Sequence, residues 1–530
     1  MATMIQESMD SEYDDVRFPQ ERTQGLILGL TLEQVIVVLA GVLIGMAFIL
    51  RGGPSMFVGI GLMAVIGAFG ATRFRGRSLP GWVWVAAQYL RRGATDQLEY
   101  RQGMAPAHVL ELVDGEPQAP VSEAGPQAQR DAKGRIKPGE PARFRLPGVA
   151  GELMVYAMPN GAGFVWDPRA REAVVCAKVM TTRGFDLESF DAQEERSLSW
   201  GSSLAALSRL PGVVRIQASD QTTLISGAAV EDFYESKQEG AGGRSGASID
   251  PFLDAAFREL MKEAQSMPVH EQWLTLVVSP SKITSQVKAL GGGTPALMEH
   301  MLKLMTTVES TLPRSGTQVT AWHSPRTLAG LSRSAFDPDA SVMVSTMKAD
   351  GKTAGTAPSS AGPMAVEVHA GHMVTDGNYH RTYKVSELPQ NLARLGFLDE
   401  LVFAGDFRHT VSVFLAPVER GAAVRSVQRR KTDWHTNSRL MSKLGRIGSL
   451  EHDQSLEDVE REEAELRRRH TGVEVVVLVT VTGSSRSELE SAAAEVVASG
   501  ITAECELRPV WMEQDAAFVA GALPFGRMKL

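Results

Sequence analysis

Cysteine is scarce in this chain, which has only two cysteines among its 530 residues. Cys176 and Cys505 lie far apart, each in an apolar alternating segment, which predicts two buried reduced thiols rather than a disulfide or a metal site. A large positive charge is also lacking: the net charge of -8 argues against a general nucleic-acid-binding protein. Apolar residues make up 43% of the chain and charged residues 22%, which is typical of a globular protein.

The motifs of common catalytic sites are missing as well. Residues 351–353 (Gly-Lys-Thr) match the end of a phosphate loop, but Thr346 stands where its first glycine is needed, and residues 354–358 cannot open a helix. The chain has no Gly-x-Ser-x-Gly sequence, no cysteine beside a histidine, and no paired carboxylates in an apolar setting. We therefore expect no catalytic residue, no cofactor and no enzyme activity.

The densest group of potential metal ligands contains His369, His372 and His380, with Glu367 and Asp376 nearby. Zinc sites favour histidines at short fixed spacings. Here the spacing matches no usual zinc pattern, and an Asp-Gly-Asn turn indicates that the histidines fall on different strands. We interpret the group as polar residues around a turn and predict no metal. A metal-dependent enzyme that uses the three histidines is the alternative hypothesis from a different functional class.

Two long apolar stretches lie near the N-terminus, at about residues 31–50 and 55–72, and neither carries a charge after Glu33. About 20 apolar residues in a helix span the ~30 Å hydrocarbon core of a membrane. Thr31 and Gln34 form a capping-box pattern, and the segment that ends at Pro54 breaks the chain between the two stretches. The sequence therefore predicts a transmembrane hairpin.

Glycines occur along both stretches. Gly41 and Gly45 form a Gly-x-x-x-Gly pattern in the first, and Gly59 and Gly67 belong to the second. Small residues let helix backbones approach closely. This packing can occur within the hairpin or against a partner subunit, and the sequence leaves both readings open.

Basic residues gather on one side of the predicted hairpin. Arg73, Arg75 and Arg77 follow it, whereas the link between its helices carries a single arginine. This asymmetry predicts a multi-pass protein of the cytoplasmic (inner) membrane with both termini in the cytoplasm. Trp82 and Trp84 lie among apolar residues and arginines, which predicts a helix in the headgroup region.

Strand and helix patterns alternate along the rest of the chain, for example a strand at 172–179, a helix at about 190–210 and a strand at 213–218. The expected fold class is a membrane-anchored α+β protein, with an N-terminal two-helix transmembrane hairpin, ferredoxin-like strand–helix–strand cytoplasmic domains and a long charged helical hairpin. The expected parts are a disordered acidic tail (1–16), the hairpin with its interfacial helix (17–92), a linker (93–142), a first α/β domain (143–235), a second α/β domain (249–417), the charged helical hairpin (418–470) and a C-terminal strand–helix–strand unit (471–530).

Residues 17–20 (Arg-Phe-Pro-Gln) and 29–34 (Gly-Leu-Thr-Leu-Glu-Gln), followed by the glycine-rich hairpin, resemble the PrgI family of small inner-membrane subunits of type IV secretion and conjugation channels. Residues 163–168, 362–367 and 516–526 are similar to stretches of actinobacterial membrane proteins that carry such a hairpin and stand beside conjugation-type ATPases. The order of strand–helix–strand units resembles the non-ATPase half of those ATPases.

This resemblance implies an inner-membrane scaffold, oligomeric within a complex, that anchors a partner motor ATPase among other secretion-channel subunits. The EccE family of type VII secretion has a similar arrangement of two N-terminal helices and an αβ domain, and it stays open as the alternative. Direct contact with nucleic acid also stays open.

Overall fold

The computed structural model describes residues 30–101, 127–148, 151–181, 188–226, 250–340, 355–388, 398–418 and 473–528, apart from gaps of two residues at 132–133 and 264–265, and a few isolated positions. The predicted acidic tail (1–16) lies outside these residues, and so does part of the predicted linker (93–142), chiefly between residues 102 and 126. The predicted charged helical hairpin (418–470) lies outside them too, except for isolated positions.

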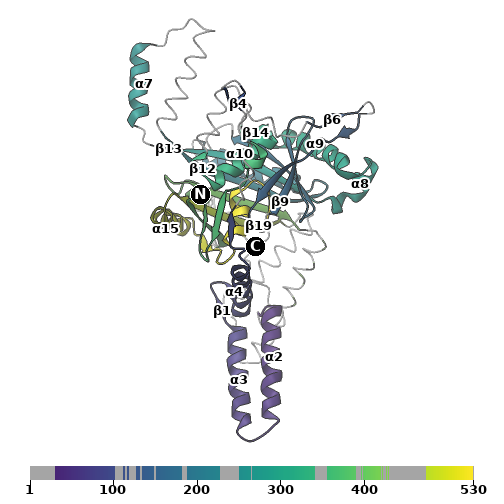
Figure 1. Ribbon diagram of the computed structural model, residues 1–530, viewed down its shortest axis with the longest axis vertical. Coiled ribbons are helices and arrows are strands. Elements are labelled where there is room, and N and C mark those ends of the chain that lie inside the picture. Colours follow the sequence, from purple (N-terminus) through teal and green to yellow (C-terminus); the bar gives the residue numbers. More distant parts are fainter. Residues whose placement is uncertain are drawn as a thin grey trace, which may run out of the picture.

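An apolar hairpin stands out from the body of the molecule (Figure 1). It is formed by α2 (Leu32–Ile49) and α3 (Ser55–Ala71), which pack against each other. A two-stranded ribbon of β1 (Arg73–Phe74) and β2 (Arg77–Ser78) follows, and α4 (Leu79–Ala94) then leads into the body.

The hairpin does not support the membrane prediction. Within the part of the chain that the structure describes, no helix combines the length and apolar character needed to cross a membrane. The helices α2 and α3 have 18 and 17 residues, about 27 and about 26 Å at 1.5 Å per residue, which is at the short end of what crosses the ~30 Å hydrocarbon core of a membrane. The prediction of a transmembrane hairpin is therefore wrong, as are the multi-pass inner-membrane localisation and the classification as an integral membrane protein that rest on it.

One large antiparallel sheet of 14 strands organises the rest of the described chain. Its first half contains β8 (Ala142–Leu146), β9 (Gly151–Ala157), β10 (Gly163–Asp167), β11 (Glu172–Thr181), β12 (Val213–Ser226), β13 (Ser266–Val278) and β14 (Thr317–Trp322). Its second half contains β3 (Glu99–Arg101), β15 (Ala365–Val368), β16 (Met373–Thr375), β17 (Asn378–Glu387), β18 (His409–Pro417), β19 (Val473–Gly483) and β20 (Glu506–Pro509).

The two halves share one strand order. The first runs β8-β9-β10-β11-β13-β12, and β14 also pairs with β11; the second runs β3-β15-β16-β17-β19-β18, and β20 also pairs with β17. The halves meet where β12 pairs with β18, with Ser219 opposite Ser412. The described body is therefore a duplicated architecture built on one continuous sheet.

This sheet corrects the predicted fold class. The chain is mixed α/β with a single large antiparallel sheet rather than a series of ferredoxin-like units. Strands from the regions 143–235, 249–417 and 471–530 all belong to it, because the long strand β12 pairs with β18 and β18 pairs with β19. The predicted domain boundaries themselves stay a prediction.

Helices cover both faces of the sheet. On one face lie α5 (Phe190–Ser208), α8 (Thr284–Ala289) and α9 (Gly293–Thr311) over the first half, and α12 (Asp399–Val402) and α15 (Arg486–Thr502) over the second. On the other face lie α10 (Pro325–Phe336) and α16 (Gln514–Ala522). A further helix, α7 (Pro251–Glu263), extends away from the body (Figure 1).

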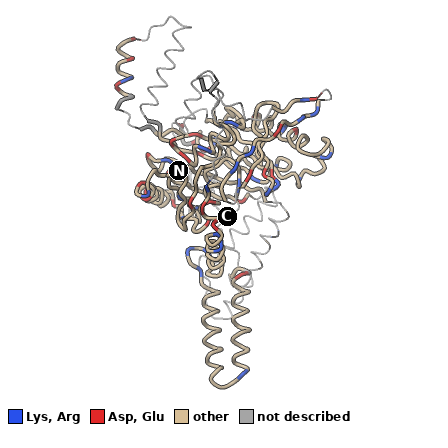
Figure 2. Tube along the Cα trace, in the orientation of Figure 1, with Lys and Arg blue, Asp and Glu red and all other residues tan. Residues whose placement is uncertain are grey.

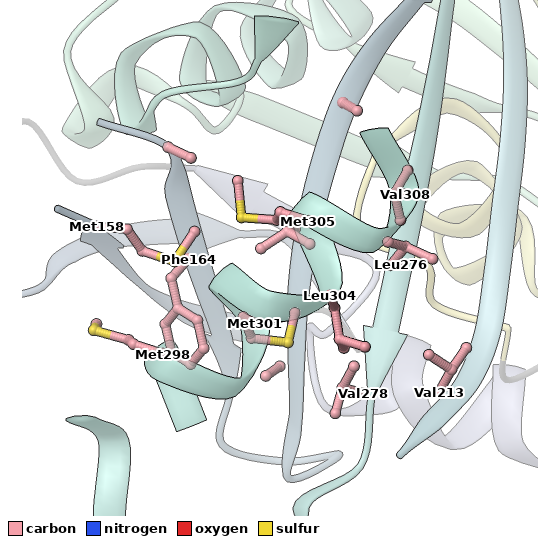
Figure 3. Close-up of a cluster of buried hydrophobic side chains, with 14 of the residues drawn as sticks. Met158, Phe164, Val213, Leu276, Val278, Met298, Met301, Leu304, Met305 and Val308 are labelled. Atoms are coloured by element: carbon pink, nitrogen blue, oxygen red, sulfur yellow. The ribbon is translucent and has the colours of Figure 1, made fainter. Parts of the chain in front are cut away.

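Successive residues of the central strands point to opposite faces of the sheet and pack in two different cores. In β11, Val175 and Ala177 pack under α9, whereas Val174 and Cys176 pack on the α10 side. Methionines of α9 fill much of the first core around Phe164 (Figure 3); their flexible side chains suit irregular gaps. Because both faces are buried, these strands read as nearly continuous apolar runs rather than alternating ones.

The second core depends on Phe518 of α16, which is 1% exposed and whose ring lies 5.1 Å from that of Phe336. We expect Phe518→Ala to lower the free energy of unfolding by about 3–5 kcal/mol, because it leaves a large cavity between α10 and α16. Urea unfolding measures this change. Met364→Ala, at a side chain 61% exposed, serves as control and should stay within about 0.5 kcal/mol. Equal effects of the two substitutions would contradict the packing described.

Candidate functional site

The hairpin begins with a capping box at Thr31 and Gln34, as predicted. The Thr31 backbone N–H donates to Gln34 Oε1 at 3.0 Å, and the Gln34 N–H donates to Thr31 Oγ1 at 3.5 Å. Gln34 is fully buried, and its Nε2 donates to the carbonyl oxygen of Ala71 at 3.4 Å. One side chain therefore caps α2 and ties it to the end of α3. At the other end of the hairpin, Pro54 is the N-cap residue of α3.

Glycines bring the two helices together. A Cβ atom on Gly41 would lie 2.6 Å from Ile66 Cγ2, and one on Gly45 would lie 2.8 Å from the carbonyl oxygen of Gly59. These three glycines therefore pack within the hairpin, which answers the question that the sequence left open. Gly67 differs, because no atom lies within 4 Å of the position of its Cβ.

The outer surface of the hairpin is apolar on all sides. Large side chains such as Leu43 (60%), Leu50 (82%) and Phe57 (74%) are more than half exposed. Charged residues are nearly absent along it, apart from the tip and the start of α2 (Figure 2). An exposed apolar surface of this extent is characteristic of a site that binds another apolar surface. We therefore take the hairpin and its base as the candidate docking site.

The base of the hairpin is held by the predicted basic residues. Arg75 has a left-handed backbone (φ 50°) in the β1–β2 turn, and its guanidinium lies 5.4 Å from the centroid of the Trp511 ring. Arg77 Nη1 lies 3.1 Å from Glu513 Oε2. Arg73 belongs to the same ribbon. Arg75 and Arg77 thus contact the body of the protein, so their clustering need not mark a membrane surface.

The helix α4 fastens the hairpin to the body a second time. Arg92 makes two contacts with the carboxylate of Asp515, at 2.5 and 3.3 Å, and the Asp515 side chain is 2% exposed. The Tyr89 hydroxyl donates to the carbonyl oxygen of Val368 in β15 at 3.3 Å. Trp82 and Trp84, which were predicted to lie in a helix in the headgroup region, both belong to α4. Trp82 Nε1 donates a hydrogen bond to the carbonyl oxygen of Phe74, and the Trp84 side chain is 67% exposed.

The structure separates the three histidines. The rings of His369 and His372 stack at 4.5 Å beside a tight turn. The ring of His380 is buried, with Thr375 Oγ1 at 2.6 Å and Thr482 Oγ1 at 2.9 Å. Among the residues with described positions, no group of three histidine, cysteine, aspartate or glutamate side chains could hold a metal ion. The glycine and lysine of the incomplete phosphate loop lie outside the described residues.

Both cysteines are buried free thiols, as predicted. Burial raises the pKa of Cys176 to about 12 and that of Cys505 to about 11. Since the thiolate is the reactive form, neither side chain is poised for chemistry.

The sequence did not single out Trp511, Glu513 and Asp515, the partners of the basic residues. One local feature pointed weakly to an anchoring residue, because α16 is a short apolar helix with an acidic residue, Asp515, in its first turn. The partner of Asp515, Arg92, is 423 residues away, so no local pattern connects the two residues.

Comparison of the chain with models of known protein families gave no match, and comparison with curated proteins gave none. The resemblances to the PrgI and EccE families therefore remain hypotheses drawn from the sequence.

Arg92→Met should loosen α4 from the body, because it leaves the Asp515 carboxylate buried without its partner. We expect a loss of about 3 kcal/mol in the free energy of unfolding, and faster hydrogen exchange in α4. The matched control is Arg91→Met, which removes the same charge at the exposed neighbouring position. Urea unfolding and hydrogen-exchange mass spectrometry report the two effects, and identical behaviour of the two variants would refute the anchoring role of Arg92.

His380 gives the stability a dependence on pH. Burial lowers the pKa of His380 to about 3, so below about pH 6.5 the unfolded chain takes up a proton that the folded protein does not. We expect His380 to contribute a loss of about 1.4 kcal/mol per pH unit between about pH 6 and about pH 4. His409, whose pKa burial also lowers, acts in the same direction. Urea unfolding across this range should show a shallower slope for His380→Gln, and an unchanged slope would count against the assignment.

Proposed function

We propose that this chain is a scaffold subunit of a type IV secretion- or conjugation-like apparatus, in which it docks a partner motor ATPase against other subunits of the channel. The observation that carries the proposal is the apolar hairpin. In the described part of the chain, bulky side chains are exposed around both of its helices, and a helix that is apolar all round is normally buried. Subunits with apolar helices therefore fit as its partners.

The base of the hairpin supports a positional role. Two separate anchors, Arg77 with Glu513 and Arg92 with Asp515, fix the direction in which the hairpin leaves the body. Ion pairs of this kind add little stability where they are exposed, but the burial of Asp515 makes its pairing with Arg92 obligatory. A partner bound to the hairpin would therefore be held at a defined orientation to the sheet.

A second exposed apolar surface lies on α7. Phe252 (78%), Leu253 (62%) and Leu260 (61%) are exposed on this helix, and the helix lies at the opposite end of the molecule from the hairpin (Figure 1). An amphipathic helix with anchors at this spacing suits a groove in a partner protein. Two apolar surfaces at opposite ends are what a bridge between channel subunits and an ATPase requires.

The test is recovery of partners with the tagged full-length chain from native cells lysed in mild detergent, followed by mass spectrometry. We expect a conjugation-type ATPase together with channel subunits. Leu39→Ser with Leu43→Ser on the hairpin should lose the channel subunits, and Phe252→Ser with Leu253→Ser on α7 should lose the ATPase. Met364→Ser, an exposed apolar residue of the body, is the control and should lose neither.

The same experiment separates the alternative. An ATPase with several motor domains in tandem, recovered with small helical secreted proteins, would favour an EccE-like role in type VII secretion. Failure to recover any ATPase under conditions that keep the complex intact would overturn the scaffold proposal.

A further inference from the structure

The two ends of the large sheet meet at a cavity. The strands β3 and β8 stand first and last in the order of the sheet, yet residues of both line one open cavity of about 340 Å³. It is lined by Tyr100 of β3, by Arg143, Arg145 and Leu146 of β8, and by Gly151 and Glu152 of β9. We call the space between these residues the seam cavity.

The seam cavity lies beside the base of the hairpin. Tyr100 comes a few residues after the end of α4. Gly148, just after β8, packs against the anchor of α4, because a Cβ atom on Gly148 would lie 2.6 Å from Asp515 Oδ2. Asp515 is the partner of Arg92. A protein that covers the hairpin down to its base therefore reaches the seam cavity.

The seam cavity has an arginine without an acidic partner. Arg143 and Arg145 are exposed on one face of β8, and the buried Phe144 between them points to the other face. Glu152 stands opposite Arg145 in the register of the strands, but its Oε1 lies 3.3 Å from Arg143 Nη1. The one acidic residue of the lining is therefore taken by the diagonal arginine. Within the described chain, Arg145 makes no ion pair.

The other side of the seam cavity is apolar. Leu146 is 4% exposed, and Tyr100 packs against the same core. A ligand that fits this lining presents a negative group to Arg145 and an apolar group to Tyr100. Because Glu152 also lines the cavity, a carboxylate with its single charge is repelled less than a phosphate with almost two. A glutamate or aspartate flanked by apolar residues has the required chemistry.

We propose that the seam cavity binds an acidic peptide segment of the protein that docks on the hairpin, with a carboxylate of this segment on Arg145 and an apolar side chain on Tyr100. This inference rests on the proposed function, since it gives the chemistry of the partner at the base of the docking hairpin. Burial of apolar surface has no preferred direction, whereas a guanidinium holds a carboxylate through two parallel hydrogen bonds. The seam cavity therefore fixes the position of the partner along the hairpin.

The test is binding of a fluorescent peptide to the purified full-length chain in mild detergent, measured by anisotropy at low salt. The probe alternates glutamate with leucine, and a second peptide has glutamine in place of glutamate. We expect the glutamate peptide to bind at least about 10-fold more tightly, because hydrogen bonds between charged groups contribute at least this factor. Arg145→Met should remove this preference. Its matched control is Arg171→Met, at an exposed arginine outside the cavity lining, which should keep it.

A second variant changes the affinity in the opposite direction. Glu152→Gln frees Arg143 and removes a repelling charge, so it should tighten binding of the glutamate peptide several-fold. Glu140→Gln, at an exposed acidic residue outside the cavity lining, is its control and should change nothing. Equal binding of the two peptides, or equal effects of Arg145→Met and Arg171→Met, would overturn the proposal. Displacement of the peptide by inorganic phosphate at constant ionic strength would indicate a site for a free anion and would overturn it too.

The outcomes also separate this inference from the proposed function. If the tagged chain recovers an ATPase and channel subunits but the purified chain does not distinguish the two peptides, the acidic-segment site fails while the scaffold role stands. If the glutamate peptide binds through Arg145 but no ATPase is recovered, the scaffold role fails instead. Arg145→Met removes an exposed side chain and should leave the urea midpoint unchanged, so its loss of binding reports the cavity and not the fold.

Discussion

The pairing of β12 with β18 is the interaction on which the rest of the described structure depends. Along this line of the sheet the buried side chains are polar: the Oγ atoms of Ser219 and Ser412 lie 2.7 Å apart, and Gln217 lies beside both. Gln217 Nε2 donates to the carbonyl oxygen of Leu523 at 3.1 Å, and its Oε1 accepts the N–H of Gly526 at 2.8 Å. Buried polar groups are costly unless paired, so this network fixes the C-terminal segment against the middle of the sheet.

Because the C-terminal segment is fixed against the sheet, it also sets the orientation of the hairpin. The C-terminal segment contains α16, and α16 carries Asp515, whose buried carboxylate has Arg92 as its partner. Arg92 lies in the last turn of α4, and α4 follows directly from the ribbon below α3. A chain of buried contacts therefore runs from the centre of the sheet to the base of the hairpin. The orientation of the hairpin is set by the sheet rather than by its own two helices.

The sequence predicted the features that depend on neighbouring residues. The capping box at Thr31 and Gln34 is local, and so are the strand that became β11 and the helix that became α5. Features that depend on distant residues were missed. The arginines after the hairpin looked like membrane signals because Glu513 and Asp515 are more than 400 residues away, and the single sheet was read as separate units because the β12–β18 pairing joins segments almost 200 residues apart. The two apolar stretches did form helices within one residue of the predicted bounds, but no helix in the described part of the chain has both the length and the apolar character needed to cross a membrane.

The described body has two similar halves, but a hairpin is attached to only one of them. In the second half, the start of α16 and the neighbouring strand β15 receive the hairpin through Asp515 and Val368. The corresponding start of α10 in the first half is covered differently, because the N–H of Thr356 donates to the carbonyl oxygen of Arg326 there and Gly355 packs directly on the same backbone. Only one of the two equivalent positions in the described body therefore bears a hairpin. A subunit with two similar halves but one apolar projection has a defined direction.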